Sequence, residues 1–398
     1  MNNFNYYTPT KVVFGKDTVK QVGELIFQYG GTKVLIHYGG QSAIRSGLID
    51  QVKEVLKQSN IEFVELPGVV PNPHISKVYE GIELCKKEGV DFLLPVGGGS
   101  VIDSAKAIAY GLAEPEYDVW ELYEHTRSPK ACFPLGAILT IAAAGSEMSD
   151  SSVITDEKTG KKRGCNSDLC RAKFAIMDPT YTLTLPDYQT MSGCVDIMMH
   201  TMERYFTQGL VPDITDSIAT GLIQTVMKHA QILHADPTNY NSRYEVMWAS
   251  SLSHNGLTGC GHHGGDWSSH RLEHEMGGMF DVTHGAGLAA IWSSWARYVY
   301  KDCMERFIKF SIEVMGVQDQ EDKEDKEAVV LQGIEKMEAF FHSIDMPTNM
   351  KELGIEPSEE QIKTMALGCQ AAVGGTMGSA KVLGLEDFET IYRNALGD

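Results

Sequence analysis

The sequence contains no apolar segment long enough to cross a membrane and comparatively few basic residues. No apolar run reaches the roughly 18 residues that suggest a membrane-spanning helix. Lys and Arg together number 34 against 53 Asp and Glu, so the formal net charge is −19. A chain this acidic has no overall electrostatic attraction for nucleic acid or anionic lipid. We therefore expect neither nucleic acid nor a membrane among its partners.

Closely paired cysteines and a secretion signal are also missing. The eight cysteines are scattered along the chain, and no two of them are spaced as Cys-x-x-Cys. The first ten residues lack the basic segment followed by an apolar one that a secretory signal contains. These features predict reduced cysteines in a cytoplasmic protein, and they argue against a disulfide framework or a thiolate zinc site.

The 398 residues leave room for two or three domains, and the pattern of the chain changes near its middle. In the first half, short apolar runs such as Lys33–Tyr38 and Asp91–Val96 alternate with helical spacings such as Ile44–Gln58. Similar signals predict strands at 61–66 and 135–139 and helices at 76–88 and 187–206. After Pro186 only long helical periodicities follow. The pattern predicts an α/β domain with a mainly parallel sheet over residues 1–186 and an all-helical domain over residues 187–398.

A glycine-rich turn, Gly97-Gly98-Gly99-Ser100, is expected where a strand meets a helix. Glycines allow positive φ and a close approach of ligand to backbone, and the start of a helix offers N–H groups to a phosphate. An ordinary tight turn with an N-cap would explain the same residues. The usual dinucleotide fingerprint, Gly-x-Gly-x-x-Gly, is absent.

Histidines and acids gather in the second half with metal-ligand spacing. Asp196 and His200 are four residues apart in an expected helix, so their side chains share a face, and His270 and His274 repeat this relation. One carboxylate with three imidazoles suits zinc or iron(II). The spacing favours a metal site but leaves open which histidines bind it, because further histidines and two candidate partner acids lie in the same region: His254, His262, His263, His284, Asp266 and Glu273.

Taken together, these motifs resemble the iron-containing (metal-dependent) alcohol dehydrogenases. The matching segments are Gly97-Gly-Gly-Ser-x-x-Asp-x-x-Lys106, Ala144-Gly-Ser-Glu147, Asp178-Pro179, Asp196-x-x-x-His200 and His270-x-x-x-His274 with His284. The segment 265–270 and the opening residues 4–15 look like the butanol dehydrogenase branch. The resemblance extends from about residue 4 to the end of the chain.

The resemblance implies a Rossmann-like dinucleotide-binding domain followed by an all-helical metal-binding domain, an architecture like that of dehydroquinate synthase, with the active site between the two. By position, four residues look like the ligands of one divalent ion, iron(II) or zinc: Asp196, His200, His270 and His284. His274 looks like the family's non-ligand histidine beside the nicotinamide. Seven residues fall where family members contact the dinucleotide: Asn72, Gly98, Gly99, Ser100, Asp103, Thr140 and Lys162.

The choice between NAD and NADP depends on the end of one early strand. NAD-binding proteins commonly place an acid there, which bonds the 2′-hydroxyl of the ribose. This chain has Gly39 and Gly40 followed by Gln41 and Ser42 at that place, with no carboxylate. A 2′-phosphate would meet no repulsion there, and Ser42 with backbone N–H groups would bind it. The sequence therefore predicts NADP(H), although a plain glycine turn would accept NAD as well.

The expected function is a metal-dependent NADP(H) alcohol dehydrogenase or aldehyde reductase for short-chain substrates such as butanol and butyraldehyde, with His274 as proton donor or relay. The alternatives are an NAD-dependent polyol (glycerol-like) dehydrogenase, a dehydroquinate synthase-like lyase and a nucleotide-binding sensor without catalysis. The lyase would need a cluster of Lys and Arg for an anionic substrate, whereas residues 248–295 contain only Arg271. An expected edge strand near Lys11–Phe14 predicts a homodimer.

Overall fold

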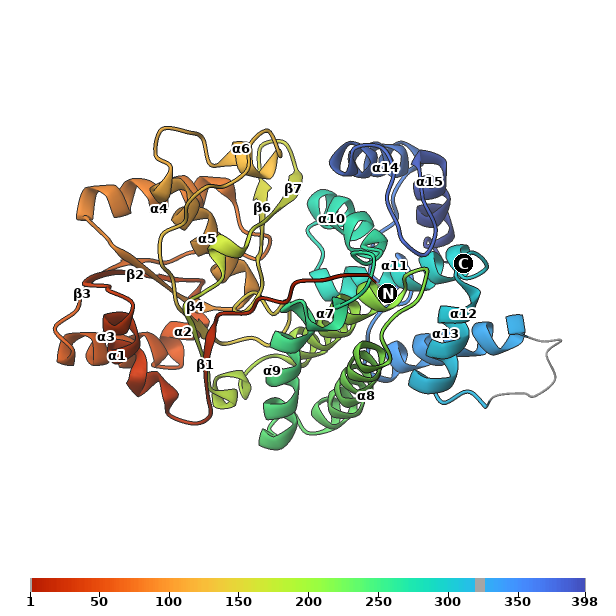
Figure 1. The fold of residues 1–398 in the computed structure, drawn as a ribbon, viewed down its shortest axis with the longest axis horizontal. Helices are drawn as coiled ribbons and strands as arrows, with labels where there is room; N and C mark the ends of the chain where they lie inside the picture. Colours follow the sequence, from red (N-terminus) through yellow and green to blue (C-terminus); the bar gives the residue numbers. More distant parts are fainter. Residues whose placement is uncertain (1, 319–325, 398) are drawn as a thin grey trace. The chain divides into compact units, whose positions relative to one another are not determined.

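The computed structural model describes residues 2–318 and 326–397, except for the side chains of Gln41 and Ser42. The chain forms two compact units, residues 7–185 and residues 186–398 together with 1–6 (Figure 1). The sequence analysis places residues 1–6 in the first domain instead. They group with the second unit because the main-chain N–H of Asn2 donates to the Gly261 carbonyl (3.3 Å) and its side-chain amide donates to the His262 carbonyl (3.2 Å).

The first unit is built on a six-stranded parallel sheet with the strand order β1-β8-β5-β4-β2-β3. Its strands are β1 (Lys11–Phe14), β2 (Lys33–Tyr38), β3 (Glu62–Leu66), β4 (Phe92–Gly97), β5 (Ala137–Leu139) and β8 (Phe174–Met177). A separate antiparallel hairpin consists of β6 (Ser151–Asp156) and β7 (Lys161–Asn166). The helices of this unit are η1 (Thr18–Gln21), α1 (Val22–Gln28), α2 (Gln41–Arg45), α3 (Leu48–Gln58), α4 (Ile75–Glu88), α5 (Gly99–Ala113), α6 (Trp120–Tyr123), η2 (Asp168–Cys170) and η3 (Pro179–Thr182).

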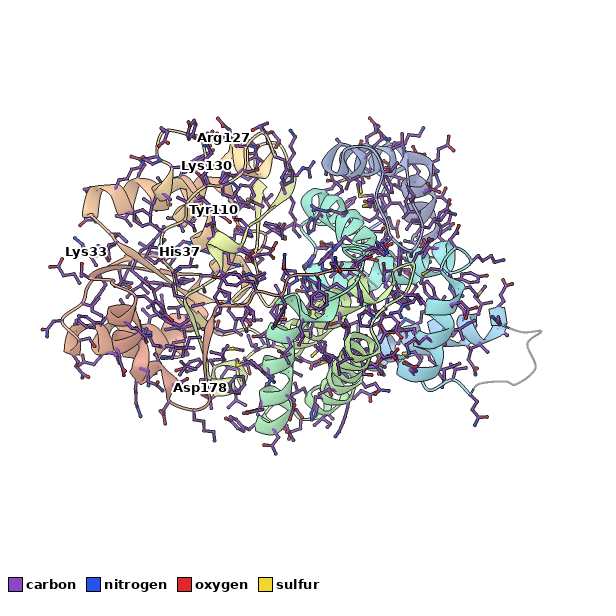
Figure 2. The ribbon with its side chains drawn as sticks, in the orientation of Figure 1. Lys33, His37, Tyr110, Arg127, Lys130 and Asp178 are labelled. Carbon is purple, nitrogen blue, oxygen red and sulfur yellow. The ribbon has the colours of Figure 1, made fainter. Side chains whose placement is uncertain are left out.

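Helices cover both faces of this sheet. Successive side chains of a strand point to opposite sides, so the apolar side chains of the strands need cover on each face. On one face, Leu35 and Leu93 belong to an apolar cluster that includes residues of α4 and α5. On the other face, Val34, Ile36 and Phe92 belong to a second cluster with residues of α1 and α3. A strand buried on both faces has to be mostly apolar, which is why β2 and β4 carry apolar residues at most positions. Even His37 of β2 is fully buried, inside this unit (Figure 2).

The order of the strands places a topological switch between β2 and β4. From β2 the chain continues to β3 on one side, and from β4 it continues to β5 on the other. In sheets of this kind, ligands bind at the carboxyl ends of the strands that flank such a switch. The glycine-rich segments after β2 and β4 are found at this place.

The second unit contains no strand among its described residues. Its elements are α7 (Asp187–Tyr205), α8 (Asp213–Ala235), α9 (Tyr240–His254), η4 (Leu257–Gly259), α10 (Ser268–Phe280), α11 (His284–Val299), α12 (Met304–Lys309), the π-helical turn η5 (Phe310–Val314), α13 (Lys326–Ser343), α14 (Glu359–Val373) and α15 (Leu385–Asn394). Helix α7 is buried along most of its length, and α8, α9 and α11 pack against it. Within the described residues, no helix combines the length and the apolar character that crossing a membrane requires.

Two features of the first unit differ from the sequence analysis. The single helix expected over 44–58 is two helices, α2 and α3, because the chain turns at Gly47, whose φ of 76° is left-handed. The β6–β7 hairpin was not predicted. Its strands carry mostly polar residues, such as Lys161 and Lys162, and therefore give no apolar pattern.

Candidate functional site

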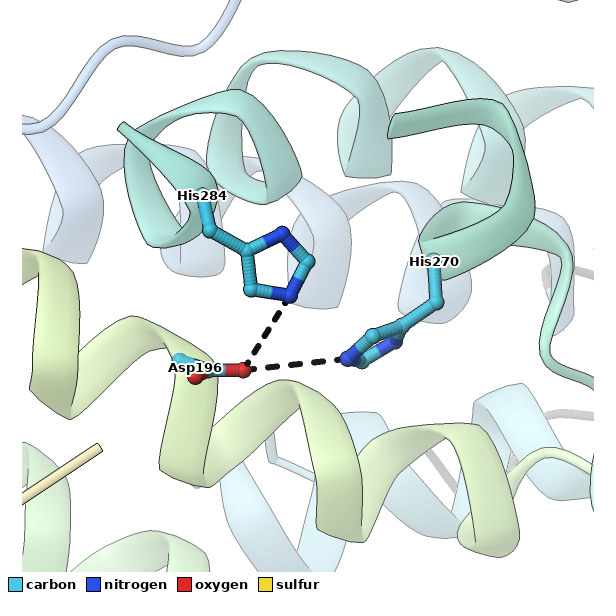
Figure 3. A group of neighbouring side chains, drawn as sticks. All are labelled: Asp196, His270 and His284. Atoms are coloured by element: carbon cyan, nitrogen blue, oxygen red, sulfur yellow. Dashed lines mark ion pairs between the residues drawn. The ribbon is translucent and has the colours of Figure 1, made fainter. Parts of the chain in front are cut away.

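Three of the predicted metal ligands meet in the second unit, each from a different helix (Figure 3). Asp196 lies in the middle of α7, His270 in the first turn of α10, and His284 is the first residue of α11. The Nε2 atoms of both histidines lie 3.7 Å from Asp196 Oδ1. The candidate ligand atoms of all three residues lie within 4.8 Å of one another.

The chemistry of this group fits a divalent cation. Asp196 and His270 are buried, and the side chain of His284 is 26% exposed. Asp196 Oδ1 and His270 Nε2 make no hydrogen bond with any residue in the described part of the chain. Leaving buried polar atoms unsatisfied costs about 1–3 kcal/mol each. A carboxylate oxygen and two imidazole nitrogens converging on one point are a donor set suited to iron(II) or zinc, so the residues present fit the ion that the sequence predicts.

His200, the fourth predicted ligand, lies beside this group but is not part of the three-residue set. Its Nδ1 contacts the main-chain oxygen of Asp196 at 2.9 Å and lies 3.1 Å from Asp196 Oδ1. The ring of His200 lies between two others, with centroid distances of 4.5 Å to His270 and 4.0 Å to His254. The assignment of His200 as a ligand therefore stays a prediction.

The electrostatic environment is shaped by burial and by the mutual proximity of these groups. Burial raises the pKa of the Asp196 carboxyl, but the neighbouring His200 and His284 lower it more, so the pKa lies well below its ordinary value. Burial lowers the pKa of His200 to about 4. Burial also lowers the pKa of His270, but Asp196 and Glu203 raise it more, to about 9. The negative field that favours a proton on His270 attracts a metal cation to the same nitrogen.

Two buried glutamates lie behind the histidines. Glu203 Oε1 is 2.9 Å from His270 Nδ1, and Glu273 Oε2 contacts His284 Nδ1. Glu273 is one of the partner acids predicted from the sequence, whereas Glu203 was not predicted. The available signal was its helical spacing, because Asp196, His200 and Glu203 are residues i, i+4 and i+7 of one helix face.

The remaining histidines and acids of this region have other surroundings. His274 is buried on α10, and together with Glu273 and His284 it forms a second group of potential ligand atoms within 4.8 Å. Neither group includes His262, whose Nδ1 contacts the Arg204 main-chain oxygen, or the exposed His263. Asp266, the other candidate partner acid, instead accepts hydrogen bonds from three main-chain N–H groups, those of Ser268, Ser379 and Ala380, at 2.8–3.1 Å.

In the first unit, several predicted dinucleotide contacts lie together at the carboxyl edge of the sheet. Tyr38 of β2 pairs with Val96 of β4, so Gly39 and Gly40 follow beside the 97–99 turn. The N–H of Thr140 donates to the Gly97 carbonyl (3.0 Å), which brings the end of β5 to the same edge. These residues flank the switch between β2 and β4.

The glycines of the 97–99 turn are required for space and not for left-handed backbone. None of Gly97, Gly98 and Gly99 has a positive φ, contrary to the reason given in the sequence analysis. A Cβ atom at Gly97 would lie 2.5 Å from Val101 Cγ2, and one at Gly98 would lie 3.1 Å from the Ile141 side chain. Gly98 is the N-cap of α5, and no side chain caps the helix there. Ser100 is the second residue of that helix and not its cap.

The other predicted contacts are more dispersed. Both oxygens of Asp103 are engaged within the protein: Oδ1 accepts from Ser146 Oγ (2.5 Å) and Oδ2 from the Val153 N–H (2.9 Å). Asn72 follows β3 in left-handed conformation (φ 53°), and Lys162 is buried in β7. The Ser42 side chain lies outside the described residues. Contact of these residues with a dinucleotide stays a prediction.

Comparison with known proteins agrees with this architecture over nearly the whole chain. Residues 9–179 match the family profile "Iron-containing alcohol dehydrogenase", and residues 190–396 match "Fe-containing alcohol dehydrogenase family, C-terminal". The chain is 38% identical to NADH-dependent butanol dehydrogenase A of Clostridium acetobutylicum over 396 residues, which cover 99% of this chain and 100% of the relative. It is 34% identical to the NADPH-dependent aldehyde reductase YqhD of Escherichia coli over 360 residues, which cover 90% and 91% of the two chains.

A solved structure shows the same fold. The crystal structure of an NADH-dependent butanol dehydrogenase A from Thermotoga maritima superposes with a TM-score of 0.95 at 38% identity, and the match covers 100% of this chain and 99% of the other. The predicted fold class, a parallel α/β domain followed by an all-helical domain, is confirmed. The chain therefore belongs to the iron-containing alcohol dehydrogenase family and is an oxidoreductase that acts on CH–OH groups.

Proposed function

We propose that this protein is a metal-dependent NADP(H) alcohol dehydrogenase and aldehyde reductase for short-chain substrates such as butanol and butyraldehyde. The observation that carries the proposal is the convergence of Asp196, His270 and His284, whose ligand atoms face one another from three helices. Relatives over 90% or more of the chain are a butanol dehydrogenase and an aldehyde reductase by name, which supports this substrate class.

Four residues would hold the cation in this proposal: Asp196, His200, His270 and His284. When bound, the cation supplies Lewis acidity at the substrate oxygen, and the nicotinamide supplies or accepts the hydride. Asp196 contributes the negative charge of the site, and its burial with the histidines keeps water from weakening that charge. His274 donates the proton to the product oxygen in the reducing direction.

NADP(H) is proposed because the turn after β2 contains no acid. Gly39 and Gly40 follow Tyr38, whose hydroxyl donates to Glu65 Oε2 (2.9 Å). Glu65 also accepts from Lys53 Nζ at 3.2 Å, so this nearby carboxylate is held by two partners. Relatives are named as NADH-dependent and as NADPH-dependent, so cofactor preference has to be measured on this chain.

The cofactor assignment is tested at Gly40, where an added Cβ would meet no atom within 4 Å. Gly39 is less suitable, because a Cβ there would lie 3.3 Å from the Val69 carbonyl oxygen. Gly40→Asp should lower the ratio of kcat/KM for NADPH to that for NADH by about 10-fold or more, because the carboxylate repels the 2′-phosphate and bonds the 2′-hydroxyl. Gly40→Asn has nearly the same shape without the charge and serves as the control. An unchanged ratio in the Asp variant would contradict the assignment.

The overall proposal is tested by following NADPH absorbance with butyraldehyde after loading the protein with iron(II) or zinc. Steady oxidation that requires the metal is the expected result. Oxidation of glycerol with NAD but no reduction of aldehydes would favour the polyol dehydrogenase instead. The absence of any nicotinamide turnover would favour the lyase or the sensor.

Two further expectations remain predictions: a homodimer formed through β1, an edge strand of the sheet, and a cytoplasmic location.

A further inference from the structure

His270 and His284 of the candidate metal centre each contact a buried carboxylate. Glu203 is 2% exposed and Glu273 is completely buried. Glu203 lies on α7, two turns after Asp196, and Glu273 lies on α10, one turn after His270. An acid so deeply buried is rare unless a partner compensates its charge.

Both carboxylates contact the ring nitrogen that faces away from Asp196. Glu203 Oε1 accepts from His270 Nδ1 and from the His270 main-chain N–H, at 2.9 Å each. Glu273 Oε2 accepts from His284 Nδ1. An ionised carboxylate can only accept hydrogen bonds, so each Nδ1 carries a hydrogen, and in the neutral ring that binds a cation the lone pair is on Nε2. Those two Nε2 atoms are the ones 3.7 Å from Asp196 Oδ1.

The third histidine is held differently. His200 Nδ1 contacts the neutral main-chain oxygen of Asp196 at 2.9 Å. The two glutamates therefore add their negative charge through His270 and His284 specifically. The backbone of α11 also approaches Glu273 closely, because a Cβ at Gly287 would lie 3.0 Å from Glu273 Cγ. A side chain at position 287 would therefore displace Glu273.

A second cation position is the competing explanation for Glu273, because Glu273, His274 and His284 also bring potential ligand atoms within 4.8 Å. Because His284 Nε2 faces Asp196 Oδ1, a second cation beside the first would have to use the lone pair of His284 Nδ1. The direct contact of Glu273 Oε2 with this nitrogen requires a hydrogen there and leaves no lone pair for a metal. The contacts therefore favour a supporting role for Glu273.

We propose that Glu203 and Glu273 are positioning residues of the metal centre. Each fixes the tautomer and the ring orientation of one histidine, Glu203 that of His270 and Glu273 that of His284. Each also strengthens the donor nitrogen by placing a negative charge behind it. The inference rests on the proposed function, since it assumes that these histidines hold a divalent ion.

The test measures binding of Co²⁺ and Zn²⁺ to the metal-stripped full-length protein, without substrate or cofactor. Co²⁺ is followed by its visible absorption and Zn²⁺ by competition with a chromophoric chelator. Glu203→Gln and Glu273→Gln should each weaken binding about 10–100-fold, the usual effect of losing such a partner. Glu275→Gln is the matched control, since Glu275 lies on α10 beside Gly368 of α14 and should leave binding unchanged.

The outcomes separate this inference from the proposed function. If the unmodified protein binds neither ion, the metal centre itself is wrong. If it binds one equivalent and both Gln variants bind within twofold of it, the positioning role is wrong. Two equivalents of metal bound per chain, one of them lost in Glu273→Gln, would establish the second cation position and overturn the role of Glu273.

If circular dichroism shows that a Gln variant is unfolded, the Asp variant takes its place. It keeps the charge but withdraws the carboxylate by one methylene, and undiminished binding would then overturn the orientation argument.

Discussion

His37 is a histidine whose two ring nitrogens are both used inside the protein. Its Nδ1 must donate to the Leu66 carbonyl (2.9 Å), because a carbonyl oxygen only accepts, and its Nε2 then accepts from Ser104 Oγ (2.9 Å). Burial lowers the pKa of His37 from 6.5 to about 4. The ring is therefore neutral in the folded protein at pH values where it is already protonated in the unfolded chain.

This difference predicts a pH dependence of stability. Because the folded pKa is the lower one, the unfolded chain binds more protons between pH 6.5 and pH 4, and stability is lost as the pH falls through that range. His37 alone should cost about 2 kcal/mol between pH 7 and pH 5. The free energy of urea unfolding, measured at both values, should fall by that amount more in the unmodified protein than in His37→Gln. Equal losses in the two proteins would refute the role of His37.

His270 and His274 lie one helical turn apart but have different predicted roles. His270→Ala removes a metal ligand and should abolish both metal retention and turnover. His274→Ala removes the proposed proton donor, so it should retain the metal and lower kcat about 10²–10⁴-fold. Metal content and kcat are measured on the same samples, with His342→Ala, a change at an exposed histidine, as the control. Loss of metal from the His274 variant would make His274 a ligand.

At the residue scale, spacing and the family resemblance together predicted which side chains come together but not what supports them. The helical spacing of Asp196 and His200 and of His270 and His274 predicted a metal site, and the resemblance assigned His270 and His284 to it. Glu203 was missed because its partner, His270, is 67 residues away in sequence, and only tertiary packing reveals the pair. Gly98 does not use the positive φ that glycine allows, and the structure shows another reason for glycine there, a neighbouring side chain that leaves little room for a Cβ.

Among the elements, α5 is held to the following segment by a buried ammonium group. Lys106 is completely buried, and its Nζ donates to the carbonyls of Ser146 (2.7 Å), Ser149 (3.1 Å) and Ser151 (2.7 Å). Asp103, one turn earlier on α5, accepts from Ser146 Oγ and from the Val153 N–H. The two side chains fix residues 146–153 against the helix that starts at the glycine turn.

Lys106→Met should therefore loosen this segment. The substitution keeps the apolar stem but leaves the carbonyls without their donor, which should destabilise the first unit by about 1–3 kcal/mol for each carbonyl that stays buried and unsatisfied. Hydrogen–deuterium exchange should accelerate in residues 146–153, and NADPH binding should weaken. Lys87→Met, at an exposed position of α4, is the control. Unchanged exchange in the segment would contradict this account.

The strength of the apolar pattern decided which elements could be predicted. The strand at Lys33–Tyr38 was predicted to the residue because burial on both faces requires a mostly apolar run. The β6–β7 hairpin carries lysines and serines and gave no such pattern. The break between α2 and α3 depends on one left-handed glycine, Gly47, in an otherwise continuous helical spacing.

For the molecule as a whole, the candidate metal ligands all belong to one of the two compact units. A ligand that binds only the folded state stabilises it by RT ln(1 + [L]/Kd), about 4 kcal/mol at a thousandfold excess over Kd. Removal of the metal by chelation should therefore speed hydrogen exchange in α7, α10 and α11. Hydrogen exchange in the strands of the sheet should not change on chelation. Addition of NADPH should instead slow hydrogen exchange in α5 and at the ends of β2 and β4. If chelation accelerates exchange equally in both units, the metal is not confined to the helical one.

The placement of residues 1–6 has a practical consequence for dissecting this enzyme. Because Asn2 bonds to Gly261 and His262, the polypeptide passes between the units twice, once after residue 6 and once after residue 185. A cut between Leu185 and Pro186 would thus separate the helical half from the opening segment that belongs to it. Anyone who wishes to express that half alone should fuse the opening hexapeptide to Pro186 through a flexible linker, or supply it as a synthetic peptide.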